Sequence, residues 1–481
     1  MQIVSYRGPG MAGGVSPALT QLVAEDGANH KWWHLDDNTI KYSNGTGQAH
    51  ARHLLPQSLI EGHYRYCNEF LWPIMHDMSQ FATYRVEDRA LYERFNRIFA
   101  REIVVGNSRY AASKLFAQDY QLALLPKELQ RLDGPGCGIF WHIPWPKSVP
   151  QEYLPAIVDI AKSLLSAEFI GFHTQEYCSN FFNFVAKNIP GTAISLRNRT
   201  ITRKPLPLAS HINTVPSSLE DTWKIQLADV NTVKTRFTKV VAAPLGLDVE
   251  HWQKISRVRS KLHLHPSLIH TDYVLSVDRA DYTKGVIPRL EAIDHFFNDH
   301  PEMIGKITFA QLCTRTRPGI DSFDDNWFKI QKLMNEINEK YAVEEWQPVL
   351  SLQGPLKPAE LSVLYANASM MLVNPVRDGL NLTAKEYIAC QSNRPGVLGL
   401  SPYCGAFEEL GPWAVSVNPF DPKEMSQSIY DALTLSDRDK LERINGLRAR
   451  LNENTLAHWC EQFKTLLEPA EDMDTAIEAA F

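Results

Sequence analysis

Residues 370–391, MMLVNPVRDGLNLTAKEYIACQ, contain the pattern that decides the fold. An apolar run ends at Pro375, a tight polar turn follows, and the sequence from Gly379 to Gln391 reads as a helix with Asp378 near its start. A short apolar strand followed by a helix is typical of a parallel β-sheet covered on both faces. The stretch therefore predicts one strand–helix unit of an α/β domain.

Similar apolar runs recur through the C-terminal half, each followed by a segment of helical periodicity. They are residues 273–278, 306–312, 349–353, 396–401 and 414–419. Strands that are apolar on both faces and alternate with helices predict a doubly wound α/β domain.

The N-terminal half repeats this pattern less regularly. Its candidate strands are residues 3–6, 138–144, 169–173 and 240–246, and a helix is predicted over residues 153–166. We predict an N-terminal Rossmann-like domain over residues 1–245 and a second over residues 246–455, facing each other across a central cleft. Residues 456–481 are expected to form a helix that packs back on the N-terminal domain, followed by a mobile acidic tail. Open α/β sheets bind ligands at the carboxyl ends of their strands, so the cleft is the expected site.

Composition excludes several other classes of protein. The 481 residues are 44% hydrophobic and 22% charged, and 49 Lys and Arg against 55 Asp and Glu give a formal net charge of −6. Such a chain is globular and lacks the excess of basic residues that drives binding to nucleic acid or anionic membrane. The seven cysteines contain no C-x-x-C pair, and no long apolar run is present, so we expect a cytoplasmic protein without disulfides.

Two features predict an anion-binding site at the edge of the C-terminal sheet. The helix near Gly379 would offer free backbone N–H groups, and Arg279 and Lys284 follow a neighbouring strand. Two cations about 4 Å from a phosphate each contribute on the order of 4 kcal/mol at an effective dielectric constant near 20. The alternative is that Asp378 only caps the helix, that Arg279 pairs with Asp278 or Asp281, and that Lys284 lies on the surface.

Seven segments together resemble glycosyltransferase family 20, which contains the trehalose-phosphate and glucosylglycerol-phosphate synthases. In chain order they are LWPIMH, AQDYQLALLP, FWHIPWP, FIGFHT, APLGLD, VDRADYTKG and NPVRDGLNLTAKEY. This order and the intervals between the segments resemble those of the family. The resemblance implies a GT-B fold and retaining transfer of glucose from a nucleotide-diphosphate glucose to a phosphorylated acceptor, without a metal or other cofactor.

The resemblance also assigns donor-side roles. Arg279 and Lys284 would hold the donor diphosphate, Asp378 and His142 would contact the glucose, and Glu386 would bind the nucleotide ribose. The backbone groups expected near the diphosphate or sugar belong to Gly379, Leu380, Asn381 and Leu382, and to Gly13 and Gly14 in a glycine-rich loop.

On the acceptor side, the resemblance places Arg7 and Arg317 at the acceptor phosphate, Trp72 beside the acceptor and Asp119 near its hydroxyl. His63 stands where trehalose-phosphate synthases usually have a tyrosine, and the usual H-D-Y-H is replaced by Gln118-Asp119-Tyr120-Gln121. The histidine, the segments around LWPIMH and Leu380 favour sn-glycerol 3-phosphate as the acceptor, and hence a glucosylglycerol-phosphate synthase that makes a compatible solute for osmoprotection. Glucose 6-phosphate, the trehalose-phosphate synthase acceptor, is the alternative.

Retention by double displacement requires a carboxylate nucleophile, and the seven segments offer no obvious one. The resemblance implies a front-face reaction in which the departing diphosphate helps to deprotonate the acceptor hydroxyl. A catalytically silent paralogue that senses sugar phosphates is the alternative of another class. ADP-, GDP- and UDP-glucose remain open as donors, as does assembly into a homo-oligomer.

Overall fold

The computed structural model describes residues 2–10, 15–24, 30–44, 47–106, 114–203, 236–257, 264–391 and 395–467. Gly13 and Gly14, and the predicted tail after Pro469, lie outside the described residues.

The first sheet has ten strands in the order β4-β3-β2-β1-β5-β6-β7-β10-β9-β8. The six central strands, β2-β1-β5-β6-β7-β10, are parallel to one another. The hairpins β3–β4 and β9–β8 extend the sheet at its two edges with antiparallel pairing. The strands are β1 (Gln2–Arg7), β2 (Lys31–Asp36), β3 (Thr39–Asn44), β4 (Ala49–Leu54), β5 (Leu115–Gln118), β6 (Cys137–Phe140), β7 (Phe169–Phe172), β8 (Thr192–Ser195), β9 (Thr200–Arg203) and β10 (Arg236–Ala242).

The second sheet has six parallel strands in the order β13-β12-β11-β14-β15-β16. They are β11 (Asp272–Arg279), β12 (Ile307–Thr314), β13 (Val349–Ser351), β14 (Met370–Val373), β15 (Val397–Leu400) and β16 (Val415–Ser416). Strands buried along their whole length, such as β14 and β15, account for the continuous apolar runs in the sequence.

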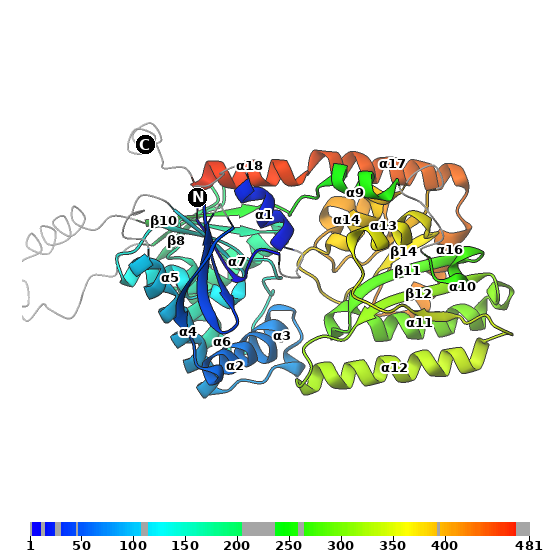
Figure 1. Ribbon diagram of the computed structural model, residues 1–481, viewed down its shortest axis with the longest axis horizontal. Helices are drawn as coiled ribbons and strands as arrows, with labels where there is room; N and C mark the ends of the chain where they lie inside the picture. The colour runs from blue at the N-terminus through cyan, green and yellow to red at the C-terminus, as the bar shows by residue number, and fades with distance from the viewer. Residues whose placement is uncertain are drawn as a thin grey trace, which may run out of the picture.

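The helices lie between the strands in chain order and cover the sheets (Figure 1). In the first half they are α1 (Ser16–Ala24), α2 (Gln57–Arg65), α3 (Trp72–Met75), α4 (Val86–Gly106), α5 (Leu125–Arg131), α6 (Leu154–Leu164) and α7 (Gln175–Asn188). In the second half they are α9 (Val249–Ser256), α10 (Pro266–Ile269), α11 (Val286–Asp299), α12 (Asp321–Tyr341), α13 (Pro358–Asn367), α14 (Leu382–Cys390), α15 (Phe407–Leu410), α16 (Pro422–Thr434), α17 (Asp437–Glu453) and α18 (Leu456–Leu467).

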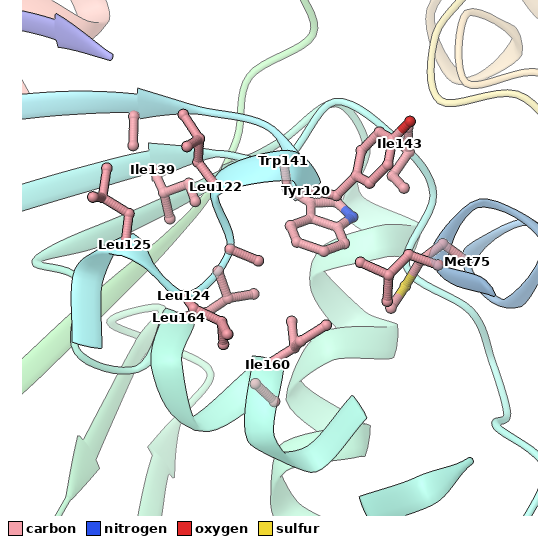
Figure 2. Close-up of a cluster of buried hydrophobic side chains, with 14 of the residues drawn as sticks. Met75, Tyr120, Leu122, Leu124, Leu125, Ile139, Trp141, Ile143, Ile160 and Leu164 are labelled. Atoms are coloured by element: carbon pink, nitrogen blue, oxygen red, sulfur yellow. The ribbon is translucent and has the colours of Figure 1, made fainter. Parts of the chain in front are cut away.

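Large apolar side chains fill the core of the first half. Figure 2 shows Ile160 and Leu164 of α6 on one side of the cluster and Ile139 and Trp141 on the other. Trp141 is fully buried, and burying an aromatic side chain of this size removes a large apolar area from water. This packing fixes the ends of β5 and β6, where several predicted site residues lie.

The last helix, α18, packs on the first sheet although the chain has already passed through the second. Phe463 stacks on Phe116 of β5 with ring centroids 4.9 Å apart, and lies 5.4 Å from the ring of Phe140 in β6. In Figure 1, α17 runs beside the second half and α18 continues beside the first. The chain therefore crosses between the two halves twice, near residue 246 and near residue 455. The exact domain boundaries at these residues remain a prediction.

The predicted parallel strands are present, but several boundaries differ. The strand predicted over residues 138–144 ends at Phe140, because the backbone N–H of His142 donates to the Asp119 carboxylate instead of to a neighbouring strand and Pro144 has no N–H to donate. The helix predicted from Gly379 begins at Leu382 and ends at Cys390, and Asn381 rather than Asp378 is its N-cap. Six strands of the first sheet were not predicted: the edge strands β4 and β8, their neighbours β3 and β9, and the parallel strands β2 and β5.

Candidate active site

Lys284 and Asp378 form an ion pair that joins the ends of two neighbouring strands. Lys284 ends the 3₁₀ turn η6 (Tyr282–Lys284) after β11, and Asp378 follows β14. Each side chain is 13% exposed, and Asn381 Nδ2 donates to Asp378 Oδ2 at 3.1 Å. Burial raises the pKa of Asp378, but the Lys284 charge and these hydrogen bonds outweigh burial and hold the pKa below its usual value. Burial likewise lowers the pKa of Lys284, but the charges of Asp378 and Asp278 and the hydrogen bond to Asp378 together raise it above its usual value. Both groups are therefore charged near neutral pH.

Arg279 lies at the end of β11, beside this pair. Its side chain is 46% exposed, and its guanidinium lies 4.0 Å from the Asp281 carboxylate and 5.7 Å from the Trp72 ring centroid. Asp278, the other partner considered for it, instead binds Arg289. The Arg279–Asp281 contact is too long for a hydrogen bond, so this carboxylate leaves the guanidinium able to bind a ligand.

Arg289 of α11 was not identified from the sequence. Its fully buried guanidinium donates to Asn374 Oδ1 at 2.6 Å, to Gln311 Oε1 at 2.9 Å and to Asp278. These partners come from the end of β14, from β12 and from β11, so one side chain connects three strands at the edge that carries Lys284 and Arg279. Arg289 thereby positions the site without being one of its predicted ligand-binding residues.

The backbone from Gly379 to Asn381 lies directly before α14. The N–H groups of Gly379, Leu380 and Asn381 have no hydrogen-bond partner among the described residues. Asn381 has a φ of 77°, and its side chain accepts from the backbone N–H of Ala384 at 3.4 Å. Unpaired N–H groups at a helix N-terminus attract anions, and Leu382 begins the helix that supplies the dipole.

Glu386 lies one turn further along α14. Its Oε2 accepts a hydrogen bond of 2.9 Å from the hydroxyl of Tyr365 in α13, a fully buried residue that the sequence did not identify as part of the site. Burial raises the pKa of Glu386 to about 7, although the Tyr365 hydroxyl acts in the opposite direction. Tyr365 fixes one carboxylate oxygen, and the predicted ribose contact of Glu386 remains a prediction.

The first half contributes Asp119 and His142, which follow β5 and β6. Asp119 has a φ of 70°, and its Oδ1 accepts a 3.1 Å hydrogen bond from the backbone N–H of His142. Burial raises the pKa of Asp119 to about 7. The ring nitrogens of His142 lie 2.9 Å from Gln118 Oε1 and 3.3 Å from His173 Nε2. Both nitrogens are thus used within the protein, so a ring contact with glucose would have to replace one of these bonds.

Arg317 and Trp72 meet between the two halves. The Arg317 guanidinium lies 4.2 Å from the Trp72 ring centroid, donates to Asn68 Oδ1 at 2.6 Å and donates to Asp281 Oδ2 at 2.6 Å. Asn68 lies in the π-helical segment η2 (Tyr66–Leu71), between α2 and α3, and π-helical turns are frequent at functional sites. The predicted acceptor residues Arg317 and Trp72 are therefore side by side, next to Arg279.

The other acceptor-side predictions are less well supported by the geometry. His63 is 1% exposed, its Nε2 donates to the Gln121 carbonyl at 3.0 Å, and its ring lies 3.9 Å from that of Phe95. Burial lowers the pKa of His63 to about 4, so the ring is neutral. The ring is therefore enclosed in the core and bonded to the protein itself, and the acceptor contact predicted for His63 remains a prediction. Arg7 is exposed at the end of β1, and its contact with the acceptor phosphate remains a prediction.

Within the described ranges, no group of three or more His, Cys, Asp or Glu side chains is placed to hold a metal ion. Across those ranges no helix combines the length and apolar character required to cross a bilayer. Metal independence remains a prediction.

The fold and the site together define a class of enzyme. Each half is a doubly wound α/β unit, and basic side chains and unpaired backbone N–H groups lie where the two halves meet. The chain belongs to glycosyltransferase family 20, whose family model matches residues 23–469. The GT-B fold and the retaining hexosyltransferase class expected from the sequence are therefore confirmed.

The relatives and solved structures to which the chain is similar include trehalose-phosphate synthases. An alpha,alpha-trehalose-phosphate synthase (UDP-forming) of Candida albicans is 29% identical over 419 residues, covering 85% of this chain and 80% of the relative. A bifunctional trehalose-6-phosphate synthase/phosphatase of Thermoproteus tenax is 28% identical over 428 residues, which cover 88% of this chain and 54% of that longer protein. The crystal structure of a UDP-forming trehalose-phosphate synthase of Burkholderia xenovorans, in complex with glucose-6-phosphate, has a TM-score of 0.84 at 24% identity and covers 97% of this chain and 100% of its own.

Proposed function

We propose that this chain transfers glucose, with retention, from a nucleotide-diphosphate glucose to glucose 6-phosphate, as an α,α-trehalose-phosphate synthase. Support comes from the family, from relatives named UDP-forming synthases and from a similar fold that holds glucose-6-phosphate. These comparisons favour the acceptor that the sequence placed second, after sn-glycerol 3-phosphate. UDP-glucose is accordingly the first donor to test.

The observation that carries the proposal is the cluster of charge where the halves meet. Three cations, Arg279, Lys284 and Arg317, face two carboxylates, Asp281 and Asp378, which leaves a net positive charge. The unpaired amides before α14 add to this positive potential. A departing nucleoside diphosphate is the part of the reaction that needs such a site, since it gains negative charge as the glycosidic bond breaks.

The same geometry favours a front-face reaction over double displacement. Asp378 is held by Lys284 and Asn381, which fix its carboxylate and lower its nucleophilicity. We propose that Asp378 accepts hydrogen bonds from the donor glucose, while a leaving diphosphate oxygen receives the proton of the acceptor hydroxyl. Arg279 and Lys284 stabilise the charge that develops on the diphosphate.

Glycerol 3-phosphate remains the second candidate acceptor, because Leu380 and the segment around Trp72 resemble the glucosylglycerol-phosphate synthases. His63 adds little to this candidate, since its ring is buried in the core and hydrogen-bonded to a backbone carbonyl.

An acceptor screen tests the proposal. Purified protein is incubated with UDP-, ADP- or GDP-glucose, with either glucose 6-phosphate or sn-glycerol 3-phosphate, and release of nucleoside diphosphate is measured. We expect release that requires glucose 6-phosphate and yields an α,α-linked disaccharide phosphate. Release that requires glycerol 3-phosphate would identify the second candidate, and the absence of acceptor-dependent release with every pair would indicate a sensor.

A further inference from the structure

A buried chain of polar groups connects the crossing between the two halves to Gln118 at the end of β5. The backbone N–H of Leu245 donates to His173 Nδ1 at 3.3 Å. His173 Nε2 lies 3.3 Å from His142 Nδ1, and His142 Nε2 lies 2.9 Å from Gln118 Oε1. Leu245 also connects to the second half, because its carbonyl accepts from the buried ammonium of Lys385 in α14 at 3.0 Å.

Only one placement of the protons gives every hydrogen bond in this series of polar groups both a donor and an acceptor. A backbone N–H can only donate, so His173 Nδ1 carries the lone pair and His173 Nε2 carries the proton. His142 Nδ1 must then accept, and His142 Nε2 must donate to Gln118. Burial lowers the pKa of both imidazoles, to about 3 for His142, so each ring is neutral and has a single proton.

This placement of the protons fixes the orientation of the Gln118 amide. Exchanging its oxygen and nitrogen would place an N–H donor against the N–H of His142, so Oε1 must face the ring. Gln118 Nε2 is consequently the other end of the amide, and it has no hydrogen-bond partner among the described residues although Gln118 is 3% exposed. A buried N–H group without an acceptor is costly, and such a group calls for a partner that the protein itself does not supply.

The residue that follows Gln118 indicates which partner this N–H takes, because Asp119 is predicted to lie near the acceptor hydroxyl. Gln118 directly precedes Asp119, whose carboxylate bonds the backbone of His142, and the strained φ of 70° at Asp119 sets the geometry of the same turn. We propose that Gln118 Nε2 donates a hydrogen bond to an oxygen of the bound acceptor sugar, and that the His142–His173 chain holds the amide in the orientation this requires. The inference rests on the proposed function and adds a specificity-determining residue to it.

Kinetics of matched variants test the inference. Gln118→Met keeps the length of the side chain but removes the amide, and Gln130→Met makes the same change at an exposed position of α5. Initial rates are measured with glucose 6-phosphate and with sn-glycerol 3-phosphate at saturating nucleotide glucose, and then with the nucleotide glucose varied. We expect Gln118→Met to raise the KM of the acceptor about tenfold or more, with the KM of the nucleotide glucose unchanged, and Gln130→Met to alter neither. An unchanged acceptor KM, or a change confined to the nucleotide glucose, would overturn the inference.

A spectroscopic measurement on the unaltered protein does not depend on whether Gln118→Met folds. With ¹⁵N-labelled histidine, and a His142→Gln sample to assign the signals, we expect His142 to be protonated at Nε2 and unprotonated at Nδ1. The opposite tautomer would reverse the chain and overturn the proposal. A wild-type protein that shows the expected tautomer but transfers glucose to neither acceptor would instead contradict the proposed function.

Discussion

The backbone of Gly379, before α14, lies against the carbonyl oxygen of His142, after β6. A Cβ atom at Gly379 would overlap that oxygen. Since the two residues come from opposite halves of the molecule, the glycine allows the loop before α14 to approach the first half at this point.

Gly379→Ala should therefore disturb the alignment of the two halves. We expect kcat to fall about a hundredfold, because misplacement of reacting groups by about 1 Å has effects of this size. Gly305→Ala is the control: it lies in open space at a φ of 78°, so it should cost about 1 kcal/mol of stability and leave kcat unchanged. Normal turnover in Gly379→Ala would show that the close approach is not needed.

Tyr365→Phe removes the hydroxyl that donates to Glu386. If Glu386 binds the nucleotide ribose, the KM of the nucleotide glucose should rise about fivefold to tenfold, with a smaller effect on kcat. The pKa of Glu386 should also increase, because the hydroxyl lowers it, so binding that needs the carboxylate should begin at higher pH. Tyr273→Phe is a matched control, since its buried hydroxyl donates to the Leu364 carbonyl instead. Equal effects of the two variants on donor KM would argue against a positioning role.

The raised pKa of Asp119 predicts a dependence on pH. A carboxyl group whose pKa is about 7 in the folded protein, above its unfolded value, lowers stability as pH rises from about 4 to 7. Asp119→Asn removes this loss of stability. The free energy of unfolding of the variant minus that of the wild type should therefore be larger at pH 8 than at pH 4, by up to about 4 kcal/mol. Denaturant unfolding at the two pH values measures the difference. An equal difference at both values would mean that the pKa of Asp119 is not raised.

Activity should depend on the same group. If ionised Asp119 accepts a hydrogen bond from the acceptor hydroxyl, kcat/KM for the acceptor rises with pH to a plateau above about 7. Asp119→Asn should lack this rise, and a rise of the same form in the variant would assign it to another residue.

Chelation tests the predicted independence from metals. If Arg279 and Lys284 supply the positive charge that the leaving diphosphate needs, glucosyl transfer should be unchanged after treatment with EDTA and gel filtration. A loss of activity restored by Mg²⁺ or Mn²⁺ would contradict this expectation.

The sequence predicted the second half well because its signals are local. Buried parallel strands such as β11 and β14 read as continuous apolar runs, and Arg279, Lys284 and Asp378 directly follow them. The start of α14 was misplaced by three residues, although Asn381 is of the type preferred at an N-cap.

Residues that act through distant partners were missed for a different reason. The partners of Arg289 lie in three separate strands, and the bond from Tyr365 to Glu386 spans two helices. Nothing in the local sequence reveals these contacts. The edge strand β4 was missed because its sequence, AHARHL, is mostly exposed and lacks an apolar face.

The central claim is that cations where the halves meet stabilise the departing diphosphate, and Arg279 tests it most directly. Lys284→Ala is less clear, since it would leave Asp378 as a buried charge without its partner. Arg315, in the loop after β12, is a matched control because its side chain is also 46% exposed and it pairs with Asp324. We predict that Arg279→Ala lowers kcat for glucosyl transfer at least a hundredfold, consistent with a loss of about 2.7 to 4 kcal/mol, while Arg315→Ala stays near wild type and both variants keep their Tm. Turnover of Arg279→Ala within a few fold of wild type would contradict the account.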